Sequence, residues 1–298
     1  MTEPFPAIIA LFGPTAVGKT EVAIAVAERL VASGERPVAV SADAYQLYRG
    51  LETLSGAPTP EQRARLEHLF IGSHDLEEQM SAGRFAGEAR PAIDAAIAEG
   101  RRPIVVGGAG LYMQAALTDL EMRGPAGIVD PAEPVDQDTG ELHARLREVA
   151  PDAAARIDPG DRYRSGRALA LAEQGGEPDP GGAFWDAALR HPTASFGLVR
   201  DREELYRRID ERVASIAAGG GVAEVRQAAH ASPTARKAIG FEELPAGNLE
   251  AMKARTRRYA KRQLTWLRRM PSLHLVDLSA LSVDEAADRI VESTAGPQ

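Results

Sequence analysis

The sequence predicts an α/β fold, in which a parallel sheet is flanked by helices and interrupted by a small helical insertion. Three observations support this prediction. Up to residue 117, short apolar runs alternate with stretches of helical periodicity, and a glycine-rich turn joins the first run to the first such stretch. The alternation then breaks and resumes near residue 200. Strands that alternate with helices form parallel sheets with helices on both faces.

The elements of the first part follow from this alternation. The sequence predicts strands at 7–12, 37–42, near 68–73 and at 103–107, and helices at 18–32 and 82–99. Ligands of such sheets gather at the carboxyl ends of the strands. We therefore expect residues 1–117 and 200–298 to form the catalytic core and residues 118–199 to form the insertion.

The remaining elements are identified by caps and periodicity. After a stretch from 118 to 140 rich in proline, glycine and acidic residues, which predicts a loop, short helices are expected at 141–149 and 162–174. The second follows the capping run Asp158-Pro159-Gly160-Asp161. A long amphipathic helix is expected from Arg202, a strand at 273–278, and a final helix after the capping box at 282–285. Apolar residues of the long helix are Leu205, Ile209, Val213 and Ile216.

The glycine-rich turn is a P-loop. Gly13, Gly18, Lys19 and Thr20 have the spacing of that motif between an apolar run and a helical pattern. Backbone N–H groups of such a loop bind phosphate oxygens, the lysine adds a point charge, and the threonine hydroxyl binds Mg²⁺. A turn that merely joins a strand to a helix does not require the Lys-Thr pair. The expected phosphate-binding residues are Gly13, Pro14, Thr15, Ala16, Val17, Gly18, Lys19 and Thr20. The motif is typical of nucleotide-binding, often ATP-binding, proteins, but by itself it specifies only a ligand with phosphate groups.

Composition limits the other possible sites. The chain has no cysteine, which excludes disulfides and thiolate chemistry, and its six histidines show no metal-ligand spacing. Any metal is therefore expected to be Mg²⁺ held by phosphate. No apolar run approaches the ~20 residues of a membrane span, and the start lacks a cleavable leader. We expect a cytoplasmic protein without a membrane partner.

A basic stripe stands out against an acidic total. The formal net charge is −8, but residues 1–199 carry 18 basic and 29 acidic residues, whereas residues 200–298 carry 17 and 14. Between Lys253 and Arg269 there are eight basic residues and no acidic one. A solvated helix face would explain part of this, but the density of cations favours contact with a polyanion such as nucleic acid. The apolar face of the expected helix contains Met252, Thr256, Tyr259, Ala260, Gln263, Leu264 and Leu267.

Asp43 is the strongest candidate for chemistry outside the P-loop. It follows the strand at 37–42, so it should share a crevice with the P-loop. The neighbouring run suggests further contacts: Tyr45 and Tyr48 could stack on a ring, Gln46 could bind a base edge, and Arg49 could pair with a phosphate. The alternative is that Asp43 caps a turn or holds Mg²⁺.

Taken together, these residues resemble the tRNA dimethylallyltransferases, also called isopentenyl-diphosphate:tRNA transferases. The similar segments occur in the family's order over nearly the whole chain, and the pair "AIGFEEL" and "TRRYAKRQLTW" is highly specific. They lie at 13–20, 41–50, 81–85, 103–117, 155–169, 201–213, 235–244 and 256–266.

The resemblance implies a reaction. A dimethylallyl group would move from dimethylallyl diphosphate to the exocyclic N6 of the adenosine beside the anticodon of tRNA, and diphosphate would leave. The P-loop would then hold the diphosphate of the donor, with Mg²⁺ on Thr20. Because an adenine amine is a poor nucleophile, Asp43 would take its proton. Lys19, Thr20 and Arg202 would neutralise charge on the leaving diphosphate.

The resemblance also suggests how tRNA is bound, and we expect the enzyme to be a monomer. The acceptor base must leave its stack to enter the crevice, and the insertion would contact the anticodon arm. The expected tRNA-binding residues are Asp43, Ala44, Tyr45, Gln46, Ala109, Arg164, Arg167, Arg257, Arg258, Lys261 and Arg262.

The chain departs from the family's pattern at three places. Ala109 replaces the threonine usual in "GGTGLY", and Ala57 ends a run in which the family commonly has lysine. The acidic stretch 119–141 replaces a more regular, partly basic one. These departures affect the expected contacts with tRNA and leave the chemical centre intact.

Three other functions compete with tRNA prenylation. A related adenylate prenyltransferase would use free AMP, ADP or ATP and would suit an acidic surface, but it would not need the basic stripe. A P-loop kinase of a small metabolite would turn over ATP, and the sequence shows no convincing arginine-rich lid for it. An inactive RNA-binding paralogue would not need to retain Lys19, Thr20 and Asp43.

Overall fold

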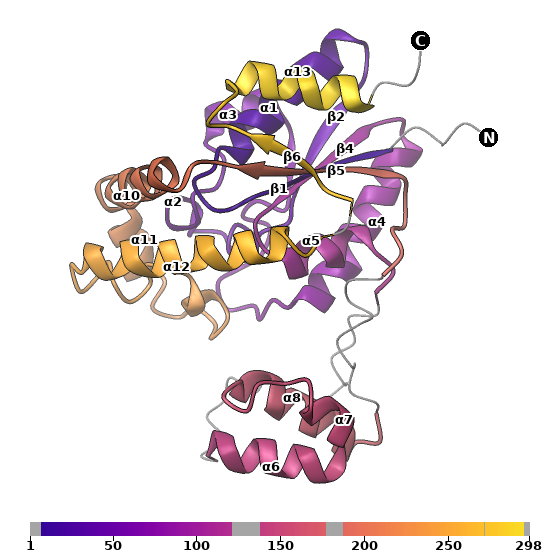
Figure 1. Ribbon diagram of the computed structural model, residues 1–298. Coiled ribbons are helices and arrows are strands. Elements are labelled where there is room, and N and C mark those ends of the chain that lie inside the picture. Colours follow the sequence, from indigo (N-terminus) through magenta and orange to yellow (C-terminus); the bar gives the residue numbers. More distant parts are fainter. Residues whose placement is uncertain (1–6, 121–137, 177–186, 271, 295–298) are drawn as a thin grey trace. The chain divides into compact units, whose positions relative to one another are not determined.

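The structure, a computed structural model, describes residues 7–120, 138–176, 187–270 and 272–294 and divides into two compact units (Figure 1). Unit 1 comprises Met1–Asp119 and Leu189–Gln298, and unit 2 comprises Leu120–Ala188. The insertion is therefore shorter than the predicted 118–199.

Unit 1 is built on one six-stranded parallel sheet, which confirms the predicted α/β class. The strand order is β3-β2-β4-β1-β5-β6. In register, Ile9 of β1 lies opposite Ile104 of β4 and Leu11 lies opposite Phe196 of β5. The strands are β1 (Ile8–Phe12), β2 (Pro37–Ser41), β3 (His68–Leu69), β4 (Arg102–Gly107), β5 (Thr193–Val199) and β6 (His274–Asp277).

Strand β5 corrects the predicted domain boundary. The sequence pattern assigns residues 193–199 to the insertion, but they pair with both β1 and β6. The segment reads TASFGLV, in which small and polar residues interrupt the apolar run, and it comes soon after a Pro/Gly-rich stretch. Burial of Phe196 and Leu198 inside the sheet gives β5 its place in the core.

Helices cover both faces of the sheet. In Figure 1, α1 (Lys19–Ala32) and α13 (Val283–Thr294) lie on one face, and α4 (Ala82–Ala98), α5 (Gly110–Leu117) and α12 (Leu249–Leu267) lie on the other. The predicted capping box is present before α13, because the N–H of Glu285 donates to the Ser282 hydroxyl and the N–H of Ser282 donates to the Glu285 carboxylate. The remaining helices of this unit are α2 (Glu52–Ser55), α3 (Pro60–Arg65), α10 (Arg202–Ala218), α11 (Gly221–Gln227) and the short 3₁₀ helix Ala235–Lys237.

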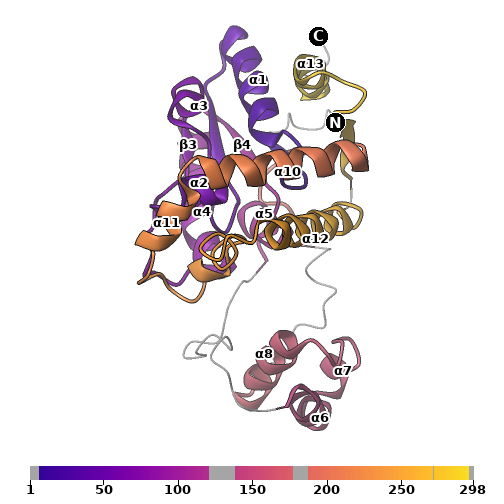
Figure 2. The same cartoon turned by 90° about the vertical axis from the view of Figure 1, so that its left-hand side faces the viewer.

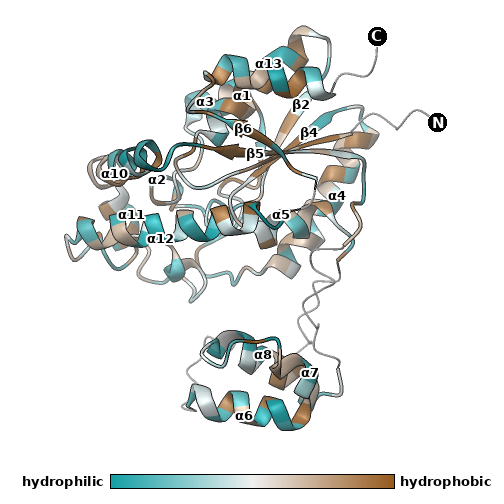
Figure 3. Cartoon of the chain, viewed as in Figure 1, coloured by the Kyte–Doolittle hydropathy of each residue, from teal (hydrophilic) through white to brown (hydrophobic). Residues whose placement is uncertain are grey.

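The main core lies between the sheet and α1. Every residue of β1 is buried, and so is the inner side of α1. Figure 3 shows the strands in brown, whereas α12 is teal along much of its visible length. In the part of the chain that the structure describes, no helix has the length and apolar character needed to cross a bilayer.

Unit 2 has a small core of its own. It contains α6 (Thr139–Val149), α7 (Pro151–Ala154) and α8 (Arg162–Glu173), so both predicted helices are confirmed. The Asp161 carboxylate accepts a hydrogen bond from the N–H of Arg164 and caps α8 as expected. Its buried apolar residues are Leu142, Leu146, Ala154, Ala168 and Leu169. Most of the acidic stretch 119–141 lies outside the described residues.

Candidate active site

One cavity of about 750 Å³ lies at the carboxyl ends of β1 and β2. The P-loop forms one wall, and Asp43 stands on another, so the predicted shared crevice is confirmed. Further walls come from the segment 52–63, from α10 and from α12. All of these elements belong to unit 1.

The P-loop is shaped by close packing against β5. A Cβ on Gly13 would come within 2.9 Å of the carbonyl oxygen of Leu198, so no other residue fits there without a shift. Gly18 has φ of 114°, a conformation that favours glycine. The Lys19 ammonium donates to the carbonyl oxygens of Gly13 (3.0 Å) and Pro14 (2.9 Å), across the loop's own mouth. The loop therefore holds a cation where phosphate would bind.

The charge of Lys19 is sensitive to its surroundings. Burial lowers the pKa of Lys19 from 10.5 to about 8, although the nearby Asp43 carboxylate acts in the opposite direction. An anionic ligand in the cavity would favour the protonated form. Thr20 follows Lys19 on the cavity wall. Among the described residues there is no group of three or more His, Asp or Glu side chains suited to a metal. The Thr20 hydroxyl is an oxygen donor of the kind that Mg²⁺ accepts, and phosphate oxygens of a bound ligand would complete such a site.

Asp43 has one oxygen engaged and the other available. Its Oδ1 accepts hydrogen bonds from the N–H groups of Tyr45 (2.9 Å) and Gln46 (3.4 Å), which is the turn cap considered as an alternative. Within the described part of the chain no hydrogen bond to Oδ2 is seen, and the residue lines the cavity. One carboxylate can therefore both shape the turn and act as a base.

The neighbours of Asp43 have different roles from those expected. The amide of Gln46 is occupied, since its Oε1 accepts from the Ser41 hydroxyl (2.8 Å) and its Nε2 donates to the Gly56 carbonyl (3.3 Å). Tyr48 is not a stacking surface, because it is buried and its hydroxyl bonds Thr234 (2.8 Å). Arg49 is exposed and pairs with Asp75. Only Tyr45 and Gln46 of this group line the cavity.

Tyr45 closes one side of the cavity. Its hydroxyl donates to the carbonyl oxygen of Lys237 (3.3 Å), and burial raises the pKa of Tyr45 to about 12. Ala44 is partly buried beside it, and it is not among the residues that line the cavity.

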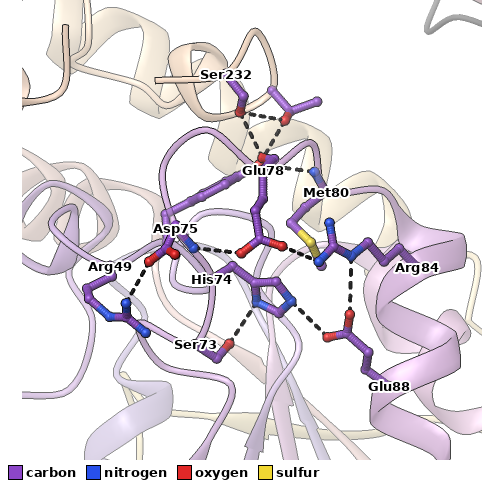
Figure 4. Close-up of polar contacts among 11 residues, drawn as sticks. Arg49, Ser73, His74, Asp75, Glu78, Met80, Arg84, Glu88 and Ser232 are labelled. Atoms are coloured by element: carbon purple, nitrogen blue, oxygen red, sulfur yellow. Dashed lines mark hydrogen bonds and ion pairs between the residues drawn. The ribbon is translucent and has the colours of Figure 1, made fainter. Parts of the chain in front are cut away.

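A neighbouring loop fixes the segment that carries Asp43. The N–H of His74 donates to the carbonyl of Leu47 (2.9 Å), and the N–H of Arg49 donates to the carbonyl of His74 (2.8 Å). The His74 ring is itself buried between the Ser73 hydroxyl (2.9 Å) and the Glu88 carboxylate of α4 (2.9 Å), as Figure 4 shows. The segment that follows Asp43 is thereby tied to α4.

The structure does not place Arg202 in the cavity. Its side chain is exposed and lies over the Tyr206 ring, with 5.3 Å from the guanidinium carbon to the ring centroid. Two arginines further along α10 line the cavity instead, Arg208 and Arg212. The sequence holds a signal for Arg208 and Arg212. Each immediately precedes a buried apolar residue of α10, Ile209 or Val213, and so lies at the edge of the buried side of the helix.

Arg208 and Arg212 have well-defined contacts. Arg208 Nε donates to the carbonyl of Ala16 in the P-loop (2.8 Å), and Arg212 Nη2 donates to the carbonyl of Ser55 (2.8 Å). A Cβ on Gly56 would lie 1.9 Å from Arg212 Nη2, so the guanidinium packs directly on this glycine. Burial lowers the pKa of Arg212, while Asp43 and Glu21 act to raise it. Arg212 remains a cation because guanidinium groups do not deprotonate in proteins.

The inner face of α12 is the one predicted. Its buried residues are Met252, Thr256, Ala260, Gln263 and Leu267. Tyr259 and Leu264 are only partly buried. Tyr259 lines the cavity, and burial raises its pKa. The Gln263 side chain, which the sequence indicates only as a core residue, joins two turns of the site: its Oε1 accepts from the N–H of Thr15 (2.9 Å), and its Nε2 donates to the carbonyl of Gly108 (2.8 Å).

The cations of α12 form two groups. Lys253, Arg255 and Arg257 pair with Glu250, Glu243 and Asp210, respectively. Arg258, Lys261 and Arg262 are exposed, and no acidic partner for them is present among the described residues. Arg262 also lies over the Tyr259 ring at 5.5 Å. The exposed group is therefore the one available to meet a polyanion.

The other predicted tRNA contacts are not among the residues that line the cavity. Ala109 is the N-cap residue of α5 and does not line the cavity. Arg164 and Arg167 are exposed on α8 of unit 2, and Arg164 pairs with Asp161 at 3.4 Å.

Comparisons with known proteins agree with each other. The family model described as "IPP transferase" matches residues 46–270. A tRNA dimethylallyltransferase of Bifidobacterium longum is 37% identical over 308 residues, covering 97% of this chain and 92% of that protein. The structure of a tRNA delta(2)-isopentenylpyrophosphate transferase of Staphylococcus epidermidis has a TM-score of 0.68 and 28% identity, covering 97% of this chain and 98% of that one. The structure of a eukaryotic dimethylallyltransferase acting on tRNA has a TM-score of 0.79 and 25% identity, covering 98% of this chain and 81% of that one.

Proposed function

Because this chain belongs to the IPP transferase family and is an enzyme with the tRNA dimethylallyltransferase activity of its relatives, we propose that its cavity holds a dimethylallyl diphosphate at the P-loop and an adenine of tRNA beside Asp43. The observation that carries this assignment is the shared cavity, in which the phosphate loop and a carboxylate with one available oxygen face the same space. The acceptor is N6 of the adenosine adjacent to the anticodon.

The donor diphosphate meets a set of cations. Lys19 and Arg212 lie within electrostatic reach of each other and of Asp43, and Arg208 lines the same wall. Thr20 would hold Mg²⁺ through its hydroxyl together with phosphate oxygens of the donor, and the ion would supply further positive charge to the leaving group. Charge on the diphosphate grows as its bond to the dimethylallyl carbon breaks, so fixed cations stabilise the transition state more than the ground state.

The dimethylallyl group would meet the apolar residues of the cavity lining. These include Leu54, Val213, Ile216 and Met252, and each is buried. Apolar walls exclude water, which would otherwise compete with the amine for the electrophilic carbon.

The acceptor reaction proceeds by proton removal at Asp43. The N6 atom forms a bond to the dimethylallyl carbon, the bond from that carbon to diphosphate breaks, and the N6 proton goes to the available oxygen of Asp43. The rings of Tyr45 and Tyr259 line the space where the base is held. To reach it the base leaves its stack, at a cost of a few kcal/mol.

The tRNA is held mainly through its phosphates. Arg258, Lys261 and Arg262 form the surface beside the cavity-lining residue Tyr259, and Arg164 and Arg167 of unit 2 are candidates for the anticodon arm. Such contacts give affinity without reading sequence. We also propose that the enzyme acts as a monomer in the cytoplasm.

Mass spectrometry tests the assignment. The protein is incubated with dimethylallyl diphosphate and Mg²⁺, with an adenosine-rich anticodon stem-loop in one reaction and AMP plus ATP in another. We expect a prenylated stem-loop only. Asp43→Asn retains an oxygen that can cap the turn but is not a base, so product formation should fall by about 10²- to 10⁴-fold. Prenylated mononucleotide would support an adenylate prenyltransferase instead, and no product in either reaction would support a kinase or an inactive RNA-binding protein.

A further inference from the structure

Gln263 of α12 makes two buried hydrogen bonds to two different turns of the active site. Its side chain is 3% exposed. The N–H of Thr15 requires an acceptor and the carbonyl of Gly108 requires a donor, so the two partners fix which way the amide points. Thr15 belongs to the P-loop and Gly108 to the turn between β4 and α5. Gln263 therefore joins three segments that are far apart in the sequence.

Two side chains of α12 pack closely against two glycines of the β4–α5 turn, so the helix cannot shift along the turn without a clash. A Cβ on Gly108 would lie 2.2 Å from Gln263 Nε2, and a Cβ on Gly110 would lie 2.0 Å from the Trp266 ring. Gln263 and Trp266 are on adjacent turns of the helix, so two successive turns of α12 contact the two glycines. Tightly packed contacts of this kind transmit a displacement and do not absorb it.

The same helix forms both the cavity wall and the RNA-facing surface. Tyr259, one turn before Gln263, lines the cavity, whereas Lys261 and Arg262 are exposed on the outer side. A nucleic acid bound to the exposed cations would therefore contact the same helix whose Gln263 accepts the hydrogen bond from Thr15. A diphosphate bound in the P-loop would contact the loop that donates this hydrogen bond.

We propose that Gln263 is a positioning residue that couples the two binding sites, so that diphosphate in the P-loop and tRNA on α12 each strengthen the binding of the other. The proposal rests on the function assigned above. Thermodynamic linkage requires the two effects to be equal in size. Hydrogen bonds in a buried, low-dielectric place are strong enough to carry such coupling, because breaking them leaves unpaired polar groups.

The test measures binding of a fluorescently labelled anticodon stem-loop by anisotropy, with and without inorganic diphosphate and Mg²⁺. In the unmodified protein, diphosphate should lower the Kd of the stem-loop at least about fivefold, within the usual range of coupling. In Gln263→Leu, which has a similar volume but no polar atoms, the ratio of the two Kd values should fall to within about twofold of one. Gln263→Glu retains an acceptor for Thr15 but loses the donor to Gly108, and its ratio should lie between the two.

Gln114→Leu is the matched control. Gln114 is a buried glutamine of α5 that does not line the cavity, so its replacement should leave the ratio unchanged. If Gln263 has a purely structural role, its replacement would raise the Kd of the stem-loop both with and without diphosphate and lower the melting temperature. The ratio of the two Kd values would stay as in the unmodified protein, and that result would overturn the coupling. A ratio of one in the unmodified protein would also overturn it, and this measurement does not depend on any variant folding.

The proposed function fails in a different way. If the unmodified protein binds the stem-loop and prenylates it but shows no coupling, only the role of Gln263 is lost. If it neither binds nor prenylates the stem-loop, the assignment of tRNA as the acceptor is lost, and the coupling falls with it.

Discussion

Helices α10 and α12 lie alongside each other (Figure 2), and both are rich in arginine, but two arginines of α10 and two of α12 have different surroundings. Arg208 and Arg212 of α10 line the cavity and bond backbone carbonyls. Arg258 and Arg262 of α12 are exposed, with no acidic partner in the residues that the structure describes.

Under the proposed function, the same side chain serves two kinds of phosphate recognition. A buried guanidinium is fixed in advance and acts on charge that develops at one place, so its removal should change the rate of the chemical step. An exposed guanidinium releases counterions when it meets a nucleic acid, so its removal should change affinity and salt dependence. Kinetic and binding measurements on variants of the two helices can test this division.

The largest effect is expected for the buried group. Arg212→Leu removes a fixed cation from the diphosphate site, and kcat should fall by about 10²- to 10³-fold. The KM for tRNA should change little, because Arg212 lines the cavity and is not one of the exposed cations. Steady-state kinetics with varied stem-loop would measure both. Arg202→Leu is the control, since that side chain is exposed over Tyr206 and should leave kcat within about twofold. A similar loss in both variants would contradict the placement of the cations.

The next effect concerns the exposed group. Replacement of Arg258, Lys261 and Arg262 by glutamine should raise the KM for tRNA by about tenfold or more and leave kcat at saturation unchanged. The slope of log Kd against log salt should fall by about 0.7 to 0.9 for each phosphate that the variant no longer neutralises. Binding measured over a range of about 50 to 200 mM salt checks this. A fall in kcat without a change in slope would mean that these residues act in the cavity.

The two helices also differ in how well the sequence predicts them. The basic stripe of α12 is visible as a run of charges, and its inner face follows from helical spacing. On α10 the resemblance to the family points to Arg202, because alignment assigns a role without showing which side of the helix meets the cavity. The apolar pattern from Leu205 to Ile216 shows the buried side. Arg212 lies on the margin of that side and is partly buried, and its packing depends on the glycine at position 56.

Local motifs and distant contacts explain most of the other outcomes. The P-loop and Asp43 can be located from the sequence because their spacing and position after a strand are properties of short segments. Tyrosine and glutamine are side chains that often bind ligands, so the sequence suggests Tyr48 and Gln46 as contacts. In the structure, Tyr48 bonds Thr234 instead, and Gln46 bonds Ser41 and Gly56. The link from Gln263 to Thr15 spans 248 residues, and only the folded chain reveals it.

A smaller effect is expected from pH at the donor end. Burial lowers the pKa of Lys19 to about 8 in the unliganded protein, so the protonated fraction falls as pH rises through 8. Affinity for dimethylallyl diphosphate should therefore weaken by about fivefold between pH 8 and pH 9 and change little between pH 6 and pH 7. Isothermal titration calorimetry with Mg²⁺ would measure it. Lys19→Arg should bind with no such dependence, since guanidinium does not titrate in this range.

The lowered pKa of Lys19 also makes the free energy of unfolding depend on pH. Its pKa is lower in the folded protein than in the unfolded chain, so the unfolded state binds more protons between pH 8 and pH 10.5. Without ligand, the contribution of Lys19 to the free energy of unfolding should therefore rise with pH across this window. Lys19→Met should remove that rise, which denaturant titrations at pH 7, 8 and 9.5 would reveal.

The smallest effect distinguishes two adjacent arginines of α12. Arg257 pairs with Asp210 of α10 (2.7 Å) and lies over the Tyr206 ring at 5.4 Å, whereas Arg258 is exposed. Partly exposed ion pairs contribute about 0.2–1 kcal/mol, so Arg257→Gln should lower the melting temperature by only about 1–3 °C. Because its charge is already neutralised by Asp210, the salt slope of tRNA binding should stay close to that of the unmodified protein. Arg258→Gln should give the reverse, with an unchanged melting temperature and a slope lower by about 0.7 to 0.9. If Arg257→Gln also lowers the salt slope, the ion pair between Arg257 and Asp210 opens when tRNA binds. Arg257 would then contact tRNA phosphate as the exposed arginines of α12 do.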